Sequence, residues 1–287
     1  MRLHFEDIMD KHKNFPCVIA AHGPSLNKDL DKIVESKDKG ESLLISVNRW
    51  FRFFETSPDY WILSSSILTI EALMGILNSK KVPVFFSDDG DFTPKEYIDS
   101  SLASDYLVYD QRHWEGKRCL QILKSFKDYY VENKDFNFKR YGNNSLMWQP
   151  PRCFEYAGHD PNERCCEHNV PPRTTIQEKL KEISGFEQHY STGESVTLHA
   201  IAFAIIMGCN PIYISGMDLD YSLGYADPSF TTPCVTAHYD DWKKGEVNLR
   251  NDLYVLNESA KKLGIDIINL NKEAWYDEFV KGDFKVR

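Results

Sequence analysis

The sequence predicts an α/β fold, a Rossmann-like three-layer sandwich with a mainly parallel sheet. Short apolar runs bounded by turn residues alternate with segments whose apolar residues have helical spacing, in both the first and the last third of the chain. Strands that alternate with helices are joined by right-handed crossovers, which make the strands parallel and place helices on both faces of the sheet. A chain of 287 residues is long enough to bury a large core without disulfide or metal support.

The first third of the chain contains four apolar runs and two helical segments. Strands are expected at 17–21, 43–47, 60–63 and 82–86, and helices at 26–34 and 67–77. Pro83 lies inside the fourth run and disfavours a central hydrogen-bonded position there.

The alternation returns in the last third. A long apolar helix is expected at 193–207, ending at Gly208, followed by a strand at 211–215. A second helix at 249–263, stopped by Gly264, leads into a strand at 265–268. We therefore interpret residues 1–287 as a single α/β domain.

The alternation fails at about 111–175, which we interpret as an inserted irregular or helical lid. Residues 111–152 carry nine basic and four acidic side chains, a charge of +5 within a chain whose formal charge is −9. The remainder carries −14, so the basic share of the chain is concentrated in this insertion. A lid with this charge would suit an anionic ligand.

Charge and hydropathy limit the partners. An acidic chain is a poor nucleic-acid or anionic-membrane binder, because affinity for phosphate backbones needs clustered Lys and Arg. No run approaches the ~20 apolar residues of a spanning helix, and the charged N-terminus does not look like a signal peptide. We expect a cytoplasmic protein without a transmembrane segment. A peripheral position at the inner face of the membrane and a homo-oligomeric state are both compatible with the sequence.

Seven cysteines and no secretion signal favour reduced thiols. Five Cys and His residues lie in the stretch 150–172. We favour free thiols in a lid over a structural zinc site, because the adjacent Cys165 and Cys166 cannot easily both ligate one tetrahedral ion. His199, inside the long apolar helix, is interpreted as a packing residue.

The junction His22-Gly23-Pro24-Ser25 follows the first strand and opens a helix. Ligands of open parallel sheets bind beyond the carboxyl ends of the strands. Gly23 would let the backbone approach a ligand closely, Pro24 presets the turn, and Ser25 could cap the helix or donate to a phosphate. A plain capped turn is the alternative.

Two further motifs lie at corresponding places. Ser191-Thr192-Gly193 opens the long helix, as an anion site or as an ordinary N-cap. Gly216, Asp218 and Asp220 follow the strand at 211–215. The two carboxylates could hold Mg²⁺ on a diphosphate, hydrogen-bond a sugar hydroxyl, or be solvated loop acids. No Gly-x-Gly-x-x-Gly or Walker A sequence occurs, which argues against standard dinucleotide or P-loop chemistry.

Together these motifs resemble bacterial sialyltransferases of glycosyltransferase family 42. They equally resemble the related MptE-like proteins, which include 6-hydroxymethylpterin diphosphokinases and the motility-associated (Maf) flagellin glycosyltransferases. The pattern consists of strand–Gly-Pro-Ser-Leu–helix, Asn48 after the second strand, Ser-Thr-Gly before a helix, and Ile-Ser-Gly-Met-Asp at 214–218. It covers 17–65 and 186–270 and has no counterpart at about 90–185.

The resemblance implies roles for individual residues. Those that would contact the nucleotide or its sugar are His22, Gly23, Pro24, Ser25, Asn48, Ser65, Ser191, Thr192, Gly193, Gly216 and Asp218. Tyr221 and Tyr225 would stabilise the departing phosphate, and His238 would be the general base. His22 departs from the family's usual Asn, and Asp220 replaces an aromatic residue, which creates the Asp-x-Asp pair.

The leading hypothesis is therefore an inverting glycosyltransferase that uses a nucleotide-activated sugar, a CMP-linked nonulosonate, on a glycan or protein acceptor, and that needs no metal or other cofactor. One alternative is an MptE-like diphosphokinase, with ATP and with Mg²⁺ on Asp218 and Asp220. Another is a non-catalytic nucleotide-binding protein of a surface-polysaccharide system.

Overall fold

The computed structural model describes part of the chain, and the statements below concern that part. The described residues are 1, 3, 5–53, 55–63, 81–87, 105–109, 196–220, 223–227, 253, 256–258 and 260–285. The expected helix at 67–77 and the expected insertion at 111–175 lie outside them.

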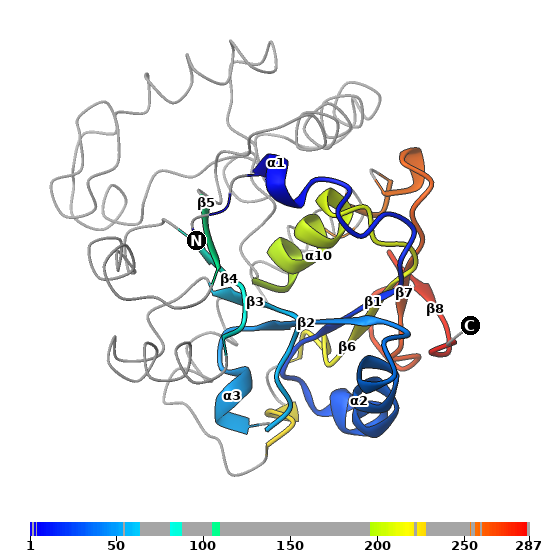
Figure 1. The fold of residues 1–287 in the computed structure, drawn as a ribbon. Helices are drawn as coiled ribbons and strands as arrows, with labels where there is room; N and C mark the ends of the chain where they lie inside the picture. Colours follow the sequence, from blue (N-terminus) through cyan, green and yellow to red (C-terminus); the bar gives the residue numbers. More distant parts are fainter. Residues whose placement is uncertain are drawn as a thin grey trace, which may run out of the picture.

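An eight-stranded sheet forms the centre of the structure (Figure 1). Its order is β5-β4-β3-β2-β1-β6-β7-β8, and each neighbouring pair is parallel. The strands are β1 Cys17–Ala20, β2 Leu43–Val47, β3 Tyr60–Leu63, β4 Val84–Ser87, β5 Tyr106–Tyr109, β6 Ile212–Ser215, β7 Ile267–Asn269 and β8 Val280–Lys281. The predicted Rossmann-like α/β class with a parallel sheet is confirmed.

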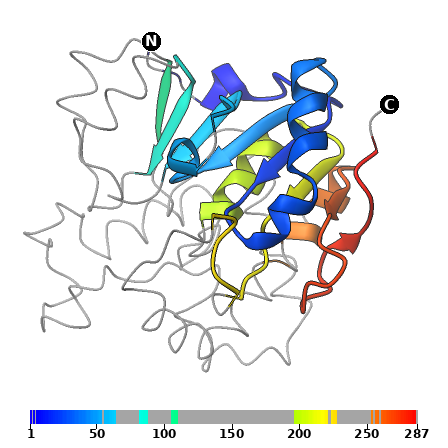
Figure 2. The ribbon, with the colours of Figure 1, turned by 90° about the horizontal axis from the view of Figure 1, so that it is seen from below.

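Helices cover both faces of this sheet. Figure 1 shows α10 (Val196–Ile206) and the short α1 (Phe5–Ile8) on one side, and α2 (Leu30–Asp38) and α3 (Trp50–Phe53) on the other. In the turned view of Figure 2, α2 lies in front of the sheet and α10 behind it. These are the three layers that the sequence predicts.

Each strand divides its side chains between two cores, because successive residues of a strand point to opposite faces. In β1, Cys17 and Ile19 belong to the core under α10, whereas Val18 and Ala20 belong to the core that also contains Leu26. The residues of β1 are buried on both faces, as expected for the centre of a parallel sheet.

Helix α10 is enclosed on every side, with Thr197 to Ile206 all buried. A helix that is apolar all round belongs in a core rather than on a surface. His199 lies within this buried run, which confirms its interpretation as a packing residue. Gly208 follows with φ +76°, the left-handed conformation that commonly ends a helix at glycine.

Two boundaries differ from prediction for identifiable reasons. The expected helix at 26–34 is a 3-10 helix, η1 Pro24–Lys28, followed by α2 from Leu30. Leu26 is fully buried and the Asn27 side chain donates to the Ala226 carbonyl at 2.7 Å, so tertiary contacts hold the first turn in the tighter form. Strand β4 begins at Val84, after Pro83, which has no N–H for the ladder.

Four elements have no counterpart among the predicted ones, namely α1, α3, β5 and β8. The first two have four residues each and β8 has two, too few to show a periodicity.

The thiols of Cys17 and Cys209 are free and buried. Burial raises the pKa of the Cys17 thiol, and the neighbouring Cys209 acts in the same direction. The other five cysteines lie outside the described residues. None of the described helices has the length and apolar character needed to cross a membrane.

Candidate functional site

The chain reverses direction across the sheet between β1 and β6. From β1 it runs outward through β2, β3, β4 and β5, then returns through α10 to β6 on the other side of β1. Such a reversal opens a crevice at the carboxyl ends of the two neighbouring strands, where open α/β sheets bind ligands. The Gly-Pro-Ser loop follows β1 and the Gly-x-Asp segment follows β6, so the two predicted motifs border this point.

Backbone hydrogen bonds join these two motifs. The Ala21 N–H donates to the Ser215 carbonyl at 2.9 Å, and the Gly23 N–H donates to the Gly216 carbonyl at 2.7 Å. The β1–β6 pairing is thereby extended beyond the ends of both strands. Gly216 has φ +73°, and a Cβ there would lie 2.7 Å from the Ala21 carbonyl oxygen, so glycine is required at this crossing.

Contacts within the protein require glycine at position 23. A Cβ at this position would lie 2.2 Å from Asp218 Oδ2 and 2.6 Å from the Gly216 carbonyl oxygen. The close approach that Gly23 allows within the protein is thus to Asp218 and Gly216. Its φ of −72° is open to any residue, so the constraint is one of space alone.

Asp218 is the centre of the polar contacts at this edge. It is 5% exposed, and both of its carboxylate oxygens accept hydrogen bonds from the protein. The Ser25 N–H donates to Oδ2 at 2.9 Å, and the Asn271 side-chain amide donates to Oδ1 at 2.7 Å. A buried carboxylate needs such donors, because an unpaired charge is costly to bury.

Ser25 does not cap a helix, which corrects one of its two predicted roles. The position before η1 is Gly23, and neither η1 nor α2 has a side-chain cap. The Ser25 Oγ is buried and, within the described part of the chain, has no hydrogen-bond partner. Pro24 is partly buried and occupies the first position of η1, which its fixed φ favours.

His22 is neutral at physiological pH. Burial lowers its pKa to about 4, the nearby Arg49 acts in the same direction, and a hydrogen bond to the Val47 backbone acts against them. Its Nε2 is buried, although the residue as a whole is partly exposed. A neutral imidazole has one N–H, and the bond to the Val47 backbone uses it, so Nε2 is a hydrogen-bond acceptor and His22 supplies no positive charge.

Asn48 lies in the turn after β2, at the same edge of the sheet. Its φ of +40° is tolerated by Asn better than by most residues. Its N–H donates to the Ile62 carbonyl at 2.8 Å, and its carbonyl accepts from Trp61 Nε1 at 2.7 Å. The adjacent Val47 contacts His22, so this turn and the Gly-Pro-Ser loop are neighbours, as the resemblance implies.

Tyr225 belongs to a segment tied to the same loop. The Ala226 N–H donates to the His22 carbonyl at 2.7 Å, and the Ala226 carbonyl accepts from Asn27. Tyr225 is partly buried and immediately precedes Ala226, the residue that makes both hydrogen bonds.

Asp220 is partly buried two residues beyond Asp218, and its carbonyl accepts from the Leu223 N–H at 3.2 Å. Across the described residues, no three His, Cys, Asp or Glu side chains gather as a metal-binding group. The remaining predicted residues, which are Ser65, Ser191, Thr192, Gly193, Tyr221 and His238, lie outside the described part, as does the stretch 150–172.

The segment after β7 was not predicted to belong to this edge. It contributes Asn271 to Asp218, and Tyr276, whose hydroxyl donates to the Met217 carbonyl at 2.7 Å. Burial, followed by the Asp218 charge, raises the pKa of Tyr276 well above its usual range. The available signal was an Asn placed just after a strand, the same signal that identified Asn48.

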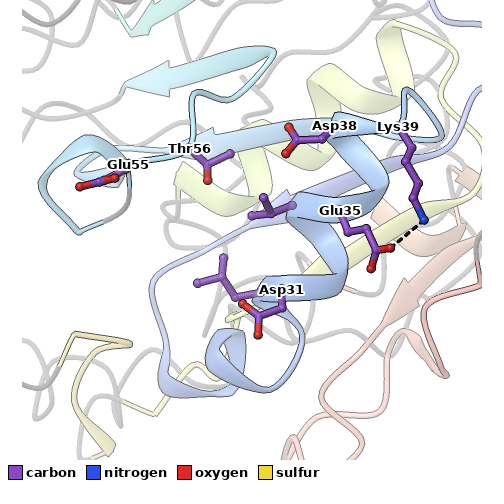
Figure 3. A pocket seen from close by; sticks show the side chains of 8 residues that line it. Asp31, Glu35, Asp38, Lys39, Glu55 and Thr56 are labelled. Carbon is purple, nitrogen blue, oxygen red and sulfur yellow. Dashed lines mark hydrogen bonds and ion pairs between the residues drawn. The ribbon is translucent and has the colours of Figure 1, made fainter.

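A separate groove of about 650 Å³ lies between α2 and residues 55–56 (Figure 3). Leu30 and Val34 provide apolar lining, and the other lining residues are Asp31, Glu35, Asp38, Lys39, Glu55 and Thr56. Lys39 is paired with Glu35 at 2.6 Å. None of the residues predicted as site residues lines this acidic groove.

The strand order and the motifs at its reversal define a Rossmann-like α/β protein whose candidate site lies at the carboxyl ends of β1 and β6. No protein-family model matches the sequence, and no curated protein matches it. Among solved structures, the chain is similar to the Maf glycosyltransferase of Magnetospirillum magneticum AMB-1, with 11% identity and a TM-score of 0.48. The match covers 97% of this chain and 36% of that one, so this chain spans about a third of that protein's length.

Proposed function

We propose that this protein is a glycosyltransferase that uses a nucleotide-activated sugar, a CMP-linked nonulosonate, as donor and a glycan or protein as acceptor. One observation carries the proposal. The Gly-Pro-Ser loop and the Gly-x-Asp segment, which the sequence resemblance assigns to the nucleotide, are hydrogen-bonded to one another at the reversal of strand order. This is where a parallel α/β sheet binds its ligand.

The chemistry of this edge suits a small nucleotide. Backbone amides and hydroxyls can hold a phosphate without lysines, as they do at many phosphate sites. Ser25 supplies a buried hydroxyl for which the described residues provide no acceptor or donor, and a ligand oxygen would satisfy it. His22 is neutral, and its Nε2 can accept a hydrogen bond from a hydroxyl of the ligand.

The proposed reaction is a single inverting displacement. The acceptor hydroxyl oxygen bonds to the anomeric carbon, the bond from that carbon to the CMP phosphate oxygen breaks, and the electron pair leaves with CMP. His238 takes the proton of the acceptor hydroxyl, and the hydroxyls of Tyr221 and Tyr225 donate to the departing phosphate. The roles of all three residues derive from the resemblance.

The diphosphokinase alternative requires Asp218 and Asp220 to hold Mg²⁺. Both oxygens of Asp218 already accept hydrogen bonds from Ser25 and Asn271, which favours a positioning role over a metal-binding one. This observation supports the transferase over the kinase.

Thermal-shift measurements with CMP, CDP, ATP and GTP, each with Mg²⁺ or with EDTA, test the proposal. We expect stabilisation by CMP and CDP that persists in EDTA. Stabilisation by ATP with Mg²⁺ alone would favour the diphosphokinase. Binding of CMP without transfer from CMP-sugars to any acceptor would favour the non-catalytic alternative.

A matched pair of variants locates the nucleotide. Ser25 and Ser46 both carry buried hydroxyls without a partner among the described residues, but Ser46 lies within β2. We expect Ser25→Ala to weaken CMP binding about tenfold, the effect of one lost hydrogen bond to a charged group, and Ser46→Ala to leave it unchanged. Equal effects in both variants would place the nucleotide elsewhere.

A further inference from the structure

Asp218 links two loops that come from opposite ends of the chain. Its Oδ2 accepts from the Ser25 amide of the Gly-Pro-Ser loop, and its Oδ1 accepts from Asn271 beyond β7. Because Asp218 is 5% exposed, these charge-assisted bonds have little competition from water. The position of the carboxylate therefore depends on both donors.

Asn271 is itself fixed in orientation. Its N–H donates to Asn269 Oδ1 at 3.1 Å, and its own Oδ1 accepts from the Glu273 N–H at 3.1 Å. With Oδ1 occupied in this way, the Nδ2 group is directed to Asp218. Asn269 is fully buried at the end of β7, so the arrangement is anchored in the sheet.

Further contacts hold the same segment against the edge. Trp275 Nε1 donates to the Leu219 carbonyl at 3.1 Å, on the residue after Asp218. On the surface, Lys28 of η1 and Glu273 form an ion pair at 2.9 Å, and such an exposed pair contributes little to stability. Residues 271–276 thus contact both halves of the candidate site.

We propose that Asn271 is a positioning residue for nucleotide binding. It holds Asp218 in the rotamer that fixes the Ser25 amide, and thereby sets the shape of the Gly-Pro-Ser loop before the nucleotide arrives. Only glycine at position 23 leaves room for the carboxylate in this place, 2.2 Å from where a Cβ would be. The inference rests on the proposed function for its ligand, although the positioning contact itself does not.

Exchanging the two side chains provides the sharpest test. Asn271→Asp alone places two carboxylates together, and Asp218→Asn alone places two amide donors together. In the double variant the amide at 218 can accept from Ser25 and donate to the carboxylate at 271, which restores the pattern of hydrogen bonds. Glu273→Gln is the control, because it removes the ion pair with Lys28 while the backbone bond to Asn271 stays.

Two measurements on the full chain are compared, the CMP dissociation constant and hydrogen exchange in peptides covering residues 22–29. We expect each single variant, and Asn271→Ala, to weaken CMP binding about tenfold and to speed exchange in 22–29 but not in α10. The double variant should return to within about threefold of wild type, and Glu273→Gln should stay at wild type.

An unrescued double variant with normal exchange would show that nucleotide binding does not depend on the contact between residues 218 and 271, and would overturn the proposal. Unchanged exchange in Asn271→Ala would overturn it as well. If wild-type protein binds no CMP, the proposed function fails, and the exchange data with their rescue still decide whether Asn271 positions the loop.

Discussion

Replacing Gly23 with alanine tests the packing at the reversal of strand order. The new Cβ would lie 2.2 Å from Asp218 Oδ2 and 2.6 Å from the Gly216 carbonyl oxygen. Ordinary contacts at such atoms exceed 3 Å, so the carboxylate must move by about 1 Å, and neither β1 nor β6 can yield because both are buried in the sheet centre.

The magnitude follows from two contributions. Overpacking costs about 1–3 kcal/mol, and losing the bond from the Ser25 N–H to the carboxylate costs about 1.5–3 kcal/mol. We expect Gly23→Ala to lower the free energy of unfolding by about 3–5 kcal/mol, a large part of the ~5–15 kcal/mol of a typical domain. Urea denaturation followed by circular dichroism measures it.

Gly40→Ala is the matched control. Gly40 has φ +70°, and no atom of the described residues lies within 4 Å of the position that a Cβ would take. Its substitution therefore meets backbone strain without a clash among these residues, about 1–2 kcal/mol. At Gly23 the backbone is unstrained, so the effect comes from the clash and from the hydrogen bond that the clash breaks. A smaller loss of stability for Gly23→Ala than for Gly40→Ala would refute this account of the loop.

Three further predictions concern single side chains. The pKa of His22 is lowered from 6.5 to about 4 in the folded state, so the unfolded chain binds more protons between these pH values and stability falls as the pH falls. From pH 7 to pH 5 the free energy of unfolding should drop by about 2 kcal/mol on this account. Urea denaturation at the two pH values measures the drop, which should be about 2 kcal/mol smaller in His22→Gln than in wild type. Phe203→Ala removes a fully buried ring 4.6 Å from that of Phe85 and should lower the free energy of unfolding by about 3–5 kcal/mol, with a loss under 1 kcal/mol arguing against the α10 packing. Tyr276→Phe removes the donor to the Met217 carbonyl and should lower it by about 1–2 kcal/mol; an unchanged midpoint in urea would mean that another donor reaches that carbonyl.

Local patterns predicted the sheet well. The strands β1, β2, β3 and β6 appear within one residue of their expected bounds, because each is a short apolar run closed by turn residues. The end of α10 was also predictable from the local sequence, because Gly208, which has the left-handed conformation, follows the last apolar turn.

The interior of the candidate site was less predictable, since its contacts join distant segments. Asp218 and Asn271 are 53 residues apart in sequence, and no spacing rule connects them. The low pKa of His22 depends first on burial and then on Arg49, which follows a different strand. Gly23 was recognised as a residue of close approach, but the partner of that approach could be found only in three dimensions.

The pairing of β1 with β6 has a consequence for how the protein is made. Ser25 and Asp218 are 193 residues apart, so the candidate site closes a very long loop. During synthesis, the edge of β1 that β6 will occupy has no partner until residues 212–215 have emerged from the ribosome. An unpaired apolar strand is a template for association with other chains. The most vulnerable stage of biosynthesis therefore lasts until the site's last strands have been translated, and slow translation before residue 212 would lower the yield of native protein.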